Sequence, residues 1–171
     1  MIGVGAFKRM LALCGYPQRF LSPKTSILTV SPAPSSPLTG TTSNTLVATD
    51  TIPAGALKVG SEVSVKVYAT HTGAGGSAAV RIYLGDGTNT VQIQGWNVNS
   101  GTTMGIGENS VPLIGVKQQI AGTVVSPFGS YAYAAAVLDE TKAWSVTYYL
   151  QPAAVGDTAQ IVMRKVTITN P

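Results

Sequence analysis

The chain has 171 residues, of which only 11% are charged, and its formal net charge is +4. This length suits one domain with an appendage, and the single cysteine, Cys14, excludes an intrachain disulfide. No apolar run reaches the roughly eighteen residues that a membrane-spanning helix needs. The low charge predicts that copies of the chain associate, because the cores of protein interfaces are depleted in charged residues.

Residues 1–25 carry the whole net charge. They contain four basic residues and no acidic one, whereas residues 26–171 hold seven of each kind. Such asymmetry is typical of a chain in which one part docks on a partner and the rest forms the body. We therefore expect residues 1–25 to be an anchor segment.

The anchor segment contains a short helical pattern. Its apolar residues are spaced as on one helix face, at Phe7, Met10, Leu11 and Cys14. Gly15 and Pro17 then end the pattern. A helix of about ten residues is marginal alone, so it needs either its own body or, as we favour, another protein. The residues expected to make this attachment are Phe7, Lys8, Arg9, Met10, Leu11, Cys14, Arg19 and Phe20.

Prolines dominate the next segment. Pro32, Pro34 and Pro37 fix their own backbone angles and keep the preceding residue away from helix. We therefore expect a linker over 26–42, with room for one short strand at 26–30. The body is expected to occupy residues 43–171.

Period-two alternation runs through the body. It is cleanest at 61–70, where the residues on one face are Val63, Val65, Val67 and Ala69. Further strands are expected at 45–52, 78–84, 88–96, 111–116, 120–125, 144–150 and 159–169, with a glycine-rich loop at 98–109. Residues 131–138 suit either a strand or a helical turn. About eight or nine strands with regular turns predict an all-β sandwich or barrel.

No convergent set of titratable groups is visible, so we expect no enzyme, metal site or cofactor. His71 is the only histidine, which excludes a multi-histidine metal site. The glycine-rich run at 73–77 joins two expected strands, and this favours a hairpin turn over a phosphate-binding loop. Asp86, within Gly-Asp-Gly, is interpreted as a turn residue in preference to a calcium ligand.

Basic residues and tyrosines are the two features of the sequence that could form a binding surface. The neutral body lacks a basic stripe, which makes nucleic acid an unlikely partner, and the basic anchor segment better suits an acidic patch on a protein. Four tyrosines are expected at the core or at a subunit interface, with stacking on sugars as the alternative: Tyr131, Tyr133, Tyr148 and Tyr149.

Three segments carry a resemblance to a known class. Residues 46–57 read LVATDTIPAGAL, a strand ending in an Ile-Pro-Ala-Gly turn, and residues 61–85 add a hairpin that closes with AVRIYLG. This hairpin resembles that of small tailed-phage virion proteins with a trimeric jelly-roll domain, such as capsid decoration proteins, head fibres and tail-fibre tips. The closing VTITNP is similar in style. The resemblance implies a jelly-roll-like sandwich and a virion structural role, and it transfers no functional residue.

The architecture favours one member of that class. The chain has neither the heptads nor the repeats of a long fibre shaft. We therefore expect a homotrimeric capsid decoration or cement protein, bound to the major capsid protein or another virion protein through residues 1–25. Three anchors would combine their modest affinities. The alternative is a short tail fibre or receptor-binding tip whose loops at 73–77 and 97–109 contact a host glycan.

Overall fold

The computed structural model describes residues 24–31, 34–58, 60–99, 104–112, 118–126, 129–139 and 141–171. Within these residues the chain forms ten strands and no helix, so the expected all-β class is confirmed. None of the described residues forms a helix able to cross a membrane. For β1, β7 and β8 the description covers the pairing of the backbone. The predicted helical anchor lies outside the described residues.

The strands are distributed along the whole described chain, and β8 resolves the ambiguity at 131–138 in favour of a strand. Their bounds are β1 (Lys24–Ser31), β2 (Thr45–Ile52), β3 (Glu62–Thr72), β4 (Ser77–Gly85), β5 (Thr90–Asn99), β6 (Gly105–Pro112), β7 (Gln118–Ser126), β8 (Gly129–Leu138), β9 (Trp144–Pro152) and β10 (Thr158–Asn170).

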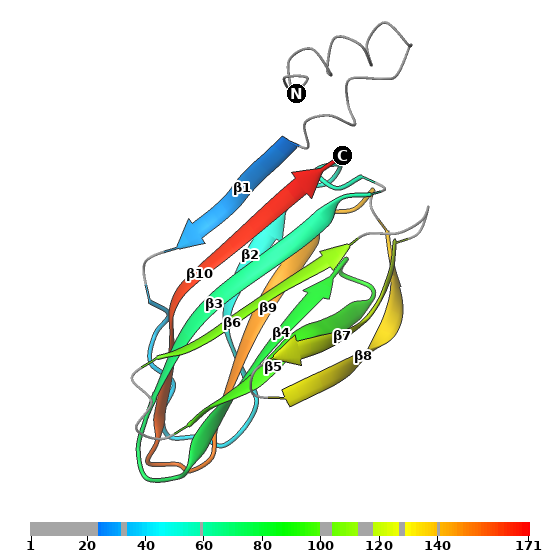
Figure 1. The fold of residues 1–171 in the computed structure, drawn as a ribbon. Helices are drawn as coiled ribbons and strands as arrows, with labels where there is room; N and C mark the ends of the chain where they lie inside the picture. The colour runs from blue at the N-terminus through cyan, green and yellow to red at the C-terminus, as the bar shows by residue number, and fades with distance from the viewer. Residues whose placement is uncertain are drawn as a thin grey trace, which may run out of the picture.

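Two four-stranded sheets pack face to face (Figure 1). One sheet has the order β1-β10-β3-β6 and the other β2-β9-β4-β5, while β7 and β8 form a separate hairpin that contacts β5 and β6. All the described strand pairs are antiparallel. Among the eight strands of the two sheets, β4 and β5 alone are consecutive neighbours in one sheet; each other connection leads to the opposite sheet.

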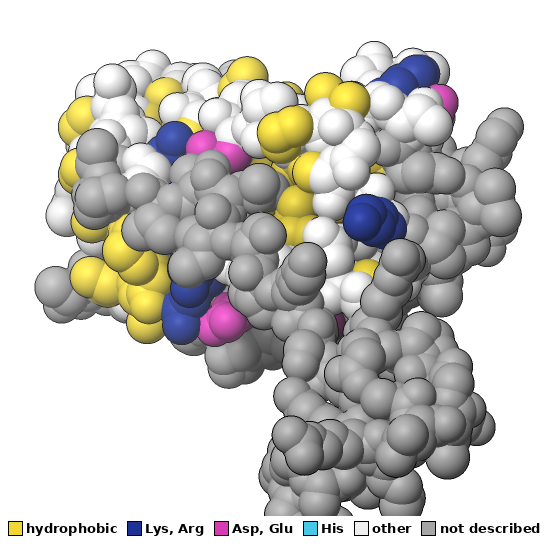
Figure 2. All heavy atoms as spheres, turned by 90° about the horizontal axis from the view of Figure 1, so that it is seen from above, with side chains coloured by type: hydrophobic (Ala, Val, Ile, Leu, Met, Phe, Trp, Pro, Cys, Tyr) yellow, Lys and Arg dark blue, Asp and Glu magenta, His cyan; other side chains and the backbone are white. Residues whose placement is uncertain are grey.

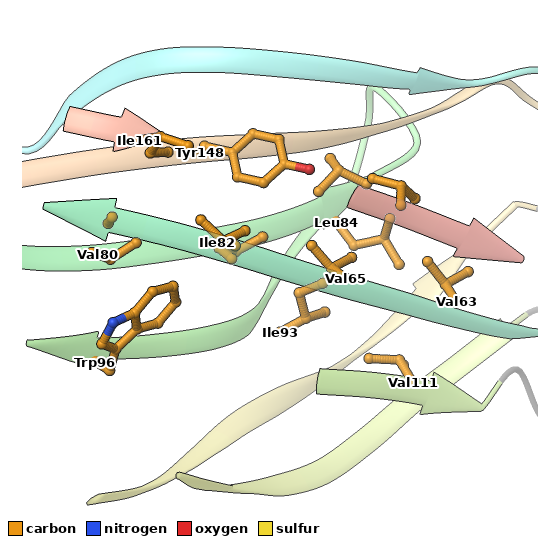
Figure 3. Packing of buried hydrophobic residues seen from close by; sticks show 14 of the residues in the cluster. Val63, Val65, Val80, Ile82, Leu84, Ile93, Trp96, Val111, Tyr148 and Ile161 are labelled. Atoms are coloured by element: carbon orange, nitrogen blue, oxygen red, sulfur yellow. The ribbon is translucent and has the colours of Figure 1, made fainter. Parts of the chain in front are cut away.

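The core lies between the sheets and is built by alternation. In β3, β4 and β9 every second residue is buried, because successive side chains of a strand point to opposite faces. The expected inward set of β3 is confirmed, with Val63 and Val65 fully buried. Figure 3 shows these valines packing with Ile82 and Ile93, so both sheets contribute to one apolar layer.

A bulge in β10 changes which side chains face the core. The register against β3 shifts between Ile161 and Met163, which inserts one extra residue. Before the bulge Ile161 is buried, and after it Val166 and Ile168 are buried. The uniform alternation expected over 159–169 is therefore wrong beyond the bulge, because the insertion moves inward positions from odd to even numbers.

Within the glycine-rich stretch 98–109, expected to be a loop, residues 98–99 and 105–109 form strand instead. β5 extends to Asn99 and β6 begins at Gly105. A Cβ on Gly107 would lie 2.6 Å from the ring of Trp96, and one on Gly105 would lie 2.8 Å from Val98. These glycines face inward and make room for the indole between the sheets. Glycine is required here because a larger side chain would collide with Trp96 or Val98. The local sequence, in which glycines usually indicate a loop, does not show this requirement.

The sandwich has two distinct ends. β1 begins opposite Asn170, where β10 ends, whereas the turn at 73–76 lies beside the start of β10 at the other end (Figure 1). The described part of 26–42 runs along this edge: after β1, the Ser35 N–H donates to the Ile161 carbonyl (2.8 Å) and Leu38 pairs with Ala159. Prolines suit such a segment because they favour extended backbone.

Candidate functional site

One polar cluster links the two sheets inside the sandwich. Asp50 of β2 is 7% exposed and accepts a hydrogen bond from the hydroxyl of Tyr148 in β9 (2.8 Å). Arg164 of β10 donates its Nε–H to the same carboxylate, at 3.0 and 2.9 Å from its two oxygens. The bulge in β10 makes this contact possible, since it turns Arg164 toward the core side.

This cluster is suited to holding the sheets together. Burial, followed by the negative charge of Asp50, raises the pKa of the Tyr148 hydroxyl far above its ordinary range, so it stays a donor. The carboxylate is satisfied by two donors, and the Arg164 guanidinium also lies over the Tyr148 ring at 5.7 Å. A tyrosine, a carboxylate and an arginine locked to one another leave no group positioned to transfer a proton.

A second buried pair fastens two turns at one end of the sandwich. His71 Nε2 lies 3.2 Å from Asp157 Oδ2, and both side chains are almost wholly buried. Asp157 also accepts the backbone N–H groups of Gly75 (3.0 Å) and Ala154 (3.2 Å). The hydrogen bond from Gly75 is the main reason that the pKa of Asp157 is lowered below its usual range.

The glycine-rich turn at 73–76 is shaped around this carboxylate. A Cβ at Gly73 or Gly75 would lie 2.1 or 2.2 Å from an oxygen of Asp157. The turn joins β3 to β4, but these strands belong to opposite sheets, so it connects the two sheets and the expected hairpin is wrong. The Gly75 amide donates to Asp157, a carboxylate of the chain itself. His71, expected beside this turn, is an inward residue of β3.

Asp86 behaves as the turn residue that the Gly-Asp-Gly motif predicts. Its Oδ1 accepts the N–H groups of Thr88 (2.8 Å) and Asn89 (2.7 Å), and its Oδ2 accepts that of Asp139 (3.0 Å). Burial alone would raise its pKa, but these backbone donors outweigh burial and lower it. Both carboxylate oxygens are used within the fold.

The buried polar groups are therefore structural. No group of three or more histidine, cysteine or acidic residues in the described part of the chain could hold a metal ion. Each of the buried carboxylates is committed to internal donors, as at Asp50, Asp86 and Asp157.

The outer face of the β1-β10-β3-β6 sheet carries an apolar strip. Tyr68 of β3 is paired with Met163 of β10 on one side and with Ile106 of β6 on the other. Ile106 is 47% exposed and Met104, just before β6, is 46% exposed. Next to the strip Lys66 forms an ion pair with Glu108 (3.0 Å), and Lys165 of β10 lies opposite Lys66 on the same face.

Charged side chains are sparse on the surface that Figure 2 shows. Lysines, arginines and acidic residues of the described chain appear there as separate spots, without a continuous patch of either sign. Nucleic acid is bound through stripes of basic residues that neutralise successive phosphates. This face of the body offers no such stripe, in keeping with the balanced charge of residues 26–171.

The structure separates the tyrosines that the sequence grouped together. Tyr148 lies in the core with 0% exposure, so it is neither at an interface nor facing a ligand, whereas Tyr149 is half-exposed on the outer face of its sheet. Tyr131 and Tyr133 belong to β8, whose side chains are outside the description. All the predicted anchoring residues, Phe7 to Phe20, also lie outside it. Sequence reasoning missed Tyr83, whose ring packs against Tyr149.

Comparisons with known proteins gave structural likenesses of low sequence identity. No family model and no curated protein matched the chain. The CBM2 module of the evolved Dit of Lactobacillus casei BL23 phage J-1 aligns at 6% identity and TM-score 0.43, covering 88% of this chain and 98% of the module.

Two further solved structures align with most of this chain. Infectious bursal disease virus strain Gx aligns at 12% identity and TM-score 0.39, covering 86% of this chain and 32% of the viral chain. The enzymatically active domain of bacteriophage CBA120 tailspike protein 4 aligns at 10% identity and TM-score 0.34, covering 84% and 19%. The function proposed below rests on this chain's own residues and strand order.

Replacing Asp50 by Ala should destabilise the sandwich by about 3 kcal/mol, because it leaves the Arg164 guanidinium partly buried without its carboxylate. Tyr148→Phe removes a single hydroxyl and should cost about 1 kcal/mol. Urea unfolding followed by tryptophan fluorescence measures both. Equal stability of Asp50→Ala and the wild type would show that the cluster does not hold the sheets together.

Acid should weaken the fold partly through Asp157. The pKa of Asp157 is lowered in the folded protein. Its contribution to the free energy of unfolding is therefore complete above the ordinary carboxyl pKa of 3.8, and it disappears as the pH falls through the pKa of the folded state. We expect Asp157→Asn to lower the melting temperature at neutral pH and to flatten its fall below about pH 4. Glu62→Gln, which removes an exposed carboxylate, is the control. Parallel acid profiles for Asp157→Asn and the wild type would contradict this assignment.

Proposed function

We propose that the chain is a non-enzymatic structural protein of a tailed-phage virion, and specifically a capsid decoration protein. The observation that carries this proposal is the strand order. Sheets ordered β1-β10-β3-β6 and β2-β9-β4-β5, with connections that repeatedly pass between them, have the form of a jelly roll of eight strands with β7 and β8 inserted. Jelly rolls are used in viral capsid and lectin domains and in cupins.

The side chains favour the first of these uses over a cupin-type enzyme. A histidine-based metal centre needs several ligands, and the chain has one histidine, His71, which is buried against Asp157. The resemblance of residues 46–85 to virion proteins points in the same direction. A carbohydrate-binding role alone would not account for the basic anchor segment, which a protein of the particle would use for attachment.

The geometry of the sandwich suits a protein that is fastened at one end. All but the last two residues of the anchor segment precede β1, and β1 begins at the end where β10 finishes, opposite Asn170. The turns at 73–76 and 153–157 lie at the other end. A chain attached through residues 1–23 would thus carry those turns on the side away from its attachment point.

The proposed assembly is a homotrimer, and the apolar strip would form the contact between its copies. Met104 and Ile106 are exposed and Tyr68 and Met163 are half-buried on one outer face, where the neighbouring Lys66 is paired with Glu108. Burying such area between copies is favourable by about 25 cal/mol per Å². Three copies would also hold three anchors together and so increase the effective affinity for the particle.

The proposal predicts that the anchor segment is necessary for attachment and dispensable for folding. Removing residues 1–22 keeps β1 whole, so the truncated protein should stay folded with an unchanged melting temperature. It should be absent from particles that otherwise incorporate the full chain, as measured by imaging of labelled particles. Label on the tail would instead support the tail-fibre alternative, and full occupancy by the truncated protein would refute the anchor.

The trimer should depend on the apolar strip. We expect the purified chain to have the mass of three copies in light scattering at micromolar concentration, and Ile106→Asp with Met163→Asp to reduce it to one copy, because charge would then be buried in the contact. Thr147→Asp, on the other outer face, is the matched control. A wild-type monomer under these conditions would contradict the homotrimer.

A further inference from the structure

The outer face of the β2-β9-β4-β5 sheet presents nine neighbouring positions from three strands. The register places them in three rows across β9, β4 and β5: Thr147, Tyr83 and Gln92; Tyr149, Arg81 and Gly95; and Gln151, Ala79 and Asn97. Standard strand spacings make this grid about 10 Å across the strands and about 13 Å along them. That size suits a short oligosaccharide.

Arg81, at the centre of the grid, is a cation without an acidic neighbour. The four strands contain one acidic residue, Asp50, and it faces the core. In the described part of the chain Arg81 bonds through Nη1, to Gln151 Oε1 (2.6 Å) and Asn44 Oδ1 (3.2 Å). Neutral amides thus position the guanidinium, while its charge remains uncompensated and its other N–H groups are available to an anion.

Two aromatic rings stand beside this cation. Tyr83 and Tyr149 have ring centroids 5.3 Å apart and planes inclined at 79°, so they form an aromatic corner. Both side chains are half-buried, which leaves part of each ring open. The C–H groups of a sugar ring are apolar, and an amphipathic tyrosine can cover them while its hydroxyl reaches water or a sugar hydroxyl.

A hollow adjoins Arg81 on the side opposite Tyr149. It has a volume of about 50 Å³ and is lined by the side chains of Arg81, Gln92 and Asn97 around Gly95, which has no side chain. A Cβ at Gly95 would lie 2.6 Å from the Gln92 amide nitrogen, so the Gln92 side chain lies over Gly95 and would have to shift to admit a methyl group. The hollow has room for one exocyclic group of a sugar, such as a hydroxymethyl or a carboxylate, among amide donors and acceptors.

Other occupants fit this face less well. A nucleic acid needs several cations along its backbone, and this face has one. A second copy of the chain suits the apolar strip on the opposite face, where Met104 and Ile106 are exposed. Leu46 of β2 is also exposed, beside Tyr149 at the edge of the grid, where it extends the apolar surface next to that ring. The grid instead combines three side-chain amides, two tyrosines and one unpaired cation, which match hydroxyls, an apolar ring face and a negative charge.

We propose that this face binds a saccharide that carries a carboxylate. Arg81 pairs with the carboxylate, Tyr83 and Tyr149 pack against the apolar side of a sugar ring, and the hollow at Gly95 receives an exocyclic group. This activity is separate from attachment to a particle, so its failure would leave the virion role standing. It also differs from the expected glycan contacts at loops 73–77 and 97–109.

The test is an NMR titration of the full chain with sialyllactose and trigalacturonic acid, each compared with a neutral counterpart, lactose and maltotriose. We expect backbone amides of β4, β5 and β9 to shift with the acidic sugars at millimolar concentration. The neutral counterparts should bind at least about tenfold more weakly, which corresponds to the loss of one charge-assisted hydrogen-bonded pair. Added salt should reduce this difference.

Variants assign the contacts. Arg81→Gln should remove the preference for acidic sugars, Tyr149→Ala should weaken acidic and neutral sugars alike, and Gly95→Val should weaken both by filling the hollow. The matched control is Lys165→Gln, which removes a cation from the outer face of the opposite sheet and should leave binding unchanged. Melting temperatures check that each variant folds; if Gly95→Val unfolds, Gly95→Ala and Arg81→Gln still decide the question.

Three results would overturn the proposal. The first is the absence of shifts in these strands with both acidic sugars. The second is an affinity for acidic sugars that Arg81→Gln leaves unchanged. The third is concentration-dependent broadening of the same amides without added sugar, which would assign the face to a second copy of the chain.

Discussion

The bulge in β10 is the constraint on which the two faces of the sandwich depend. One extra residue between Ile161 and Met163 reverses the direction of every later side chain in the strand. Arg164 is thereby turned toward the core side, where Asp50 of the opposite sheet binds it, and Met163 joins the exposed strip. The same insertion that links the sheets through an ion pair thus prepares an outer surface for contact.

The interior combines apolar side chains, two tryptophans among them, with buried carboxylates that accept internal hydrogen bonds. Asp50, Asp86 and Asp157 each accept several internal hydrogen bonds, which offsets the cost of burying a charge. Such carboxylates fix turns and join strands, and two of them, Asp50 and Asp157, connect segments that are distant in the sequence.

The two outer faces of the sandwich differ in chemistry. One sheet exposes an apolar strip beside Lys66, Glu108 and Lys165. The other exposes amides, two tyrosines, Leu46 and Arg81, which among the described residues is bound by neutral amides. The first face suits burial against another copy of the chain, and the second suits a polar ligand with hydroxyls and a negative charge. A trimeric protein could therefore use both faces at once, one for assembly and one for binding.

Local patterns in the sequence determined the elements themselves. Alternation over 61–70 gave β3 and its inward residues, and the Gly-Asp-Gly motif gave the turn at Asp86, because side-chain direction and turn chemistry depend on a few adjacent residues. The balance of charge over residues 26–171 likewise predicted, from the sequence alone, that the body has no basic stripe for binding nucleic acid.

The tertiary structure alone decided which residues meet. It placed Tyr148 in the core and Tyr149 outside, made a strand of the glycine-rich segment from Gly105, and brought Tyr83 beside Tyr149. Each of these outcomes depends on another part of the chain. The deciding features are the register between strands, the space that Trp96 needs, and a bulge that changes which side chains face the core. The sequence of one strand records its own alternation, but it does not record which strand lies beside it, and the outer face of a sheet is assembled from neighbours.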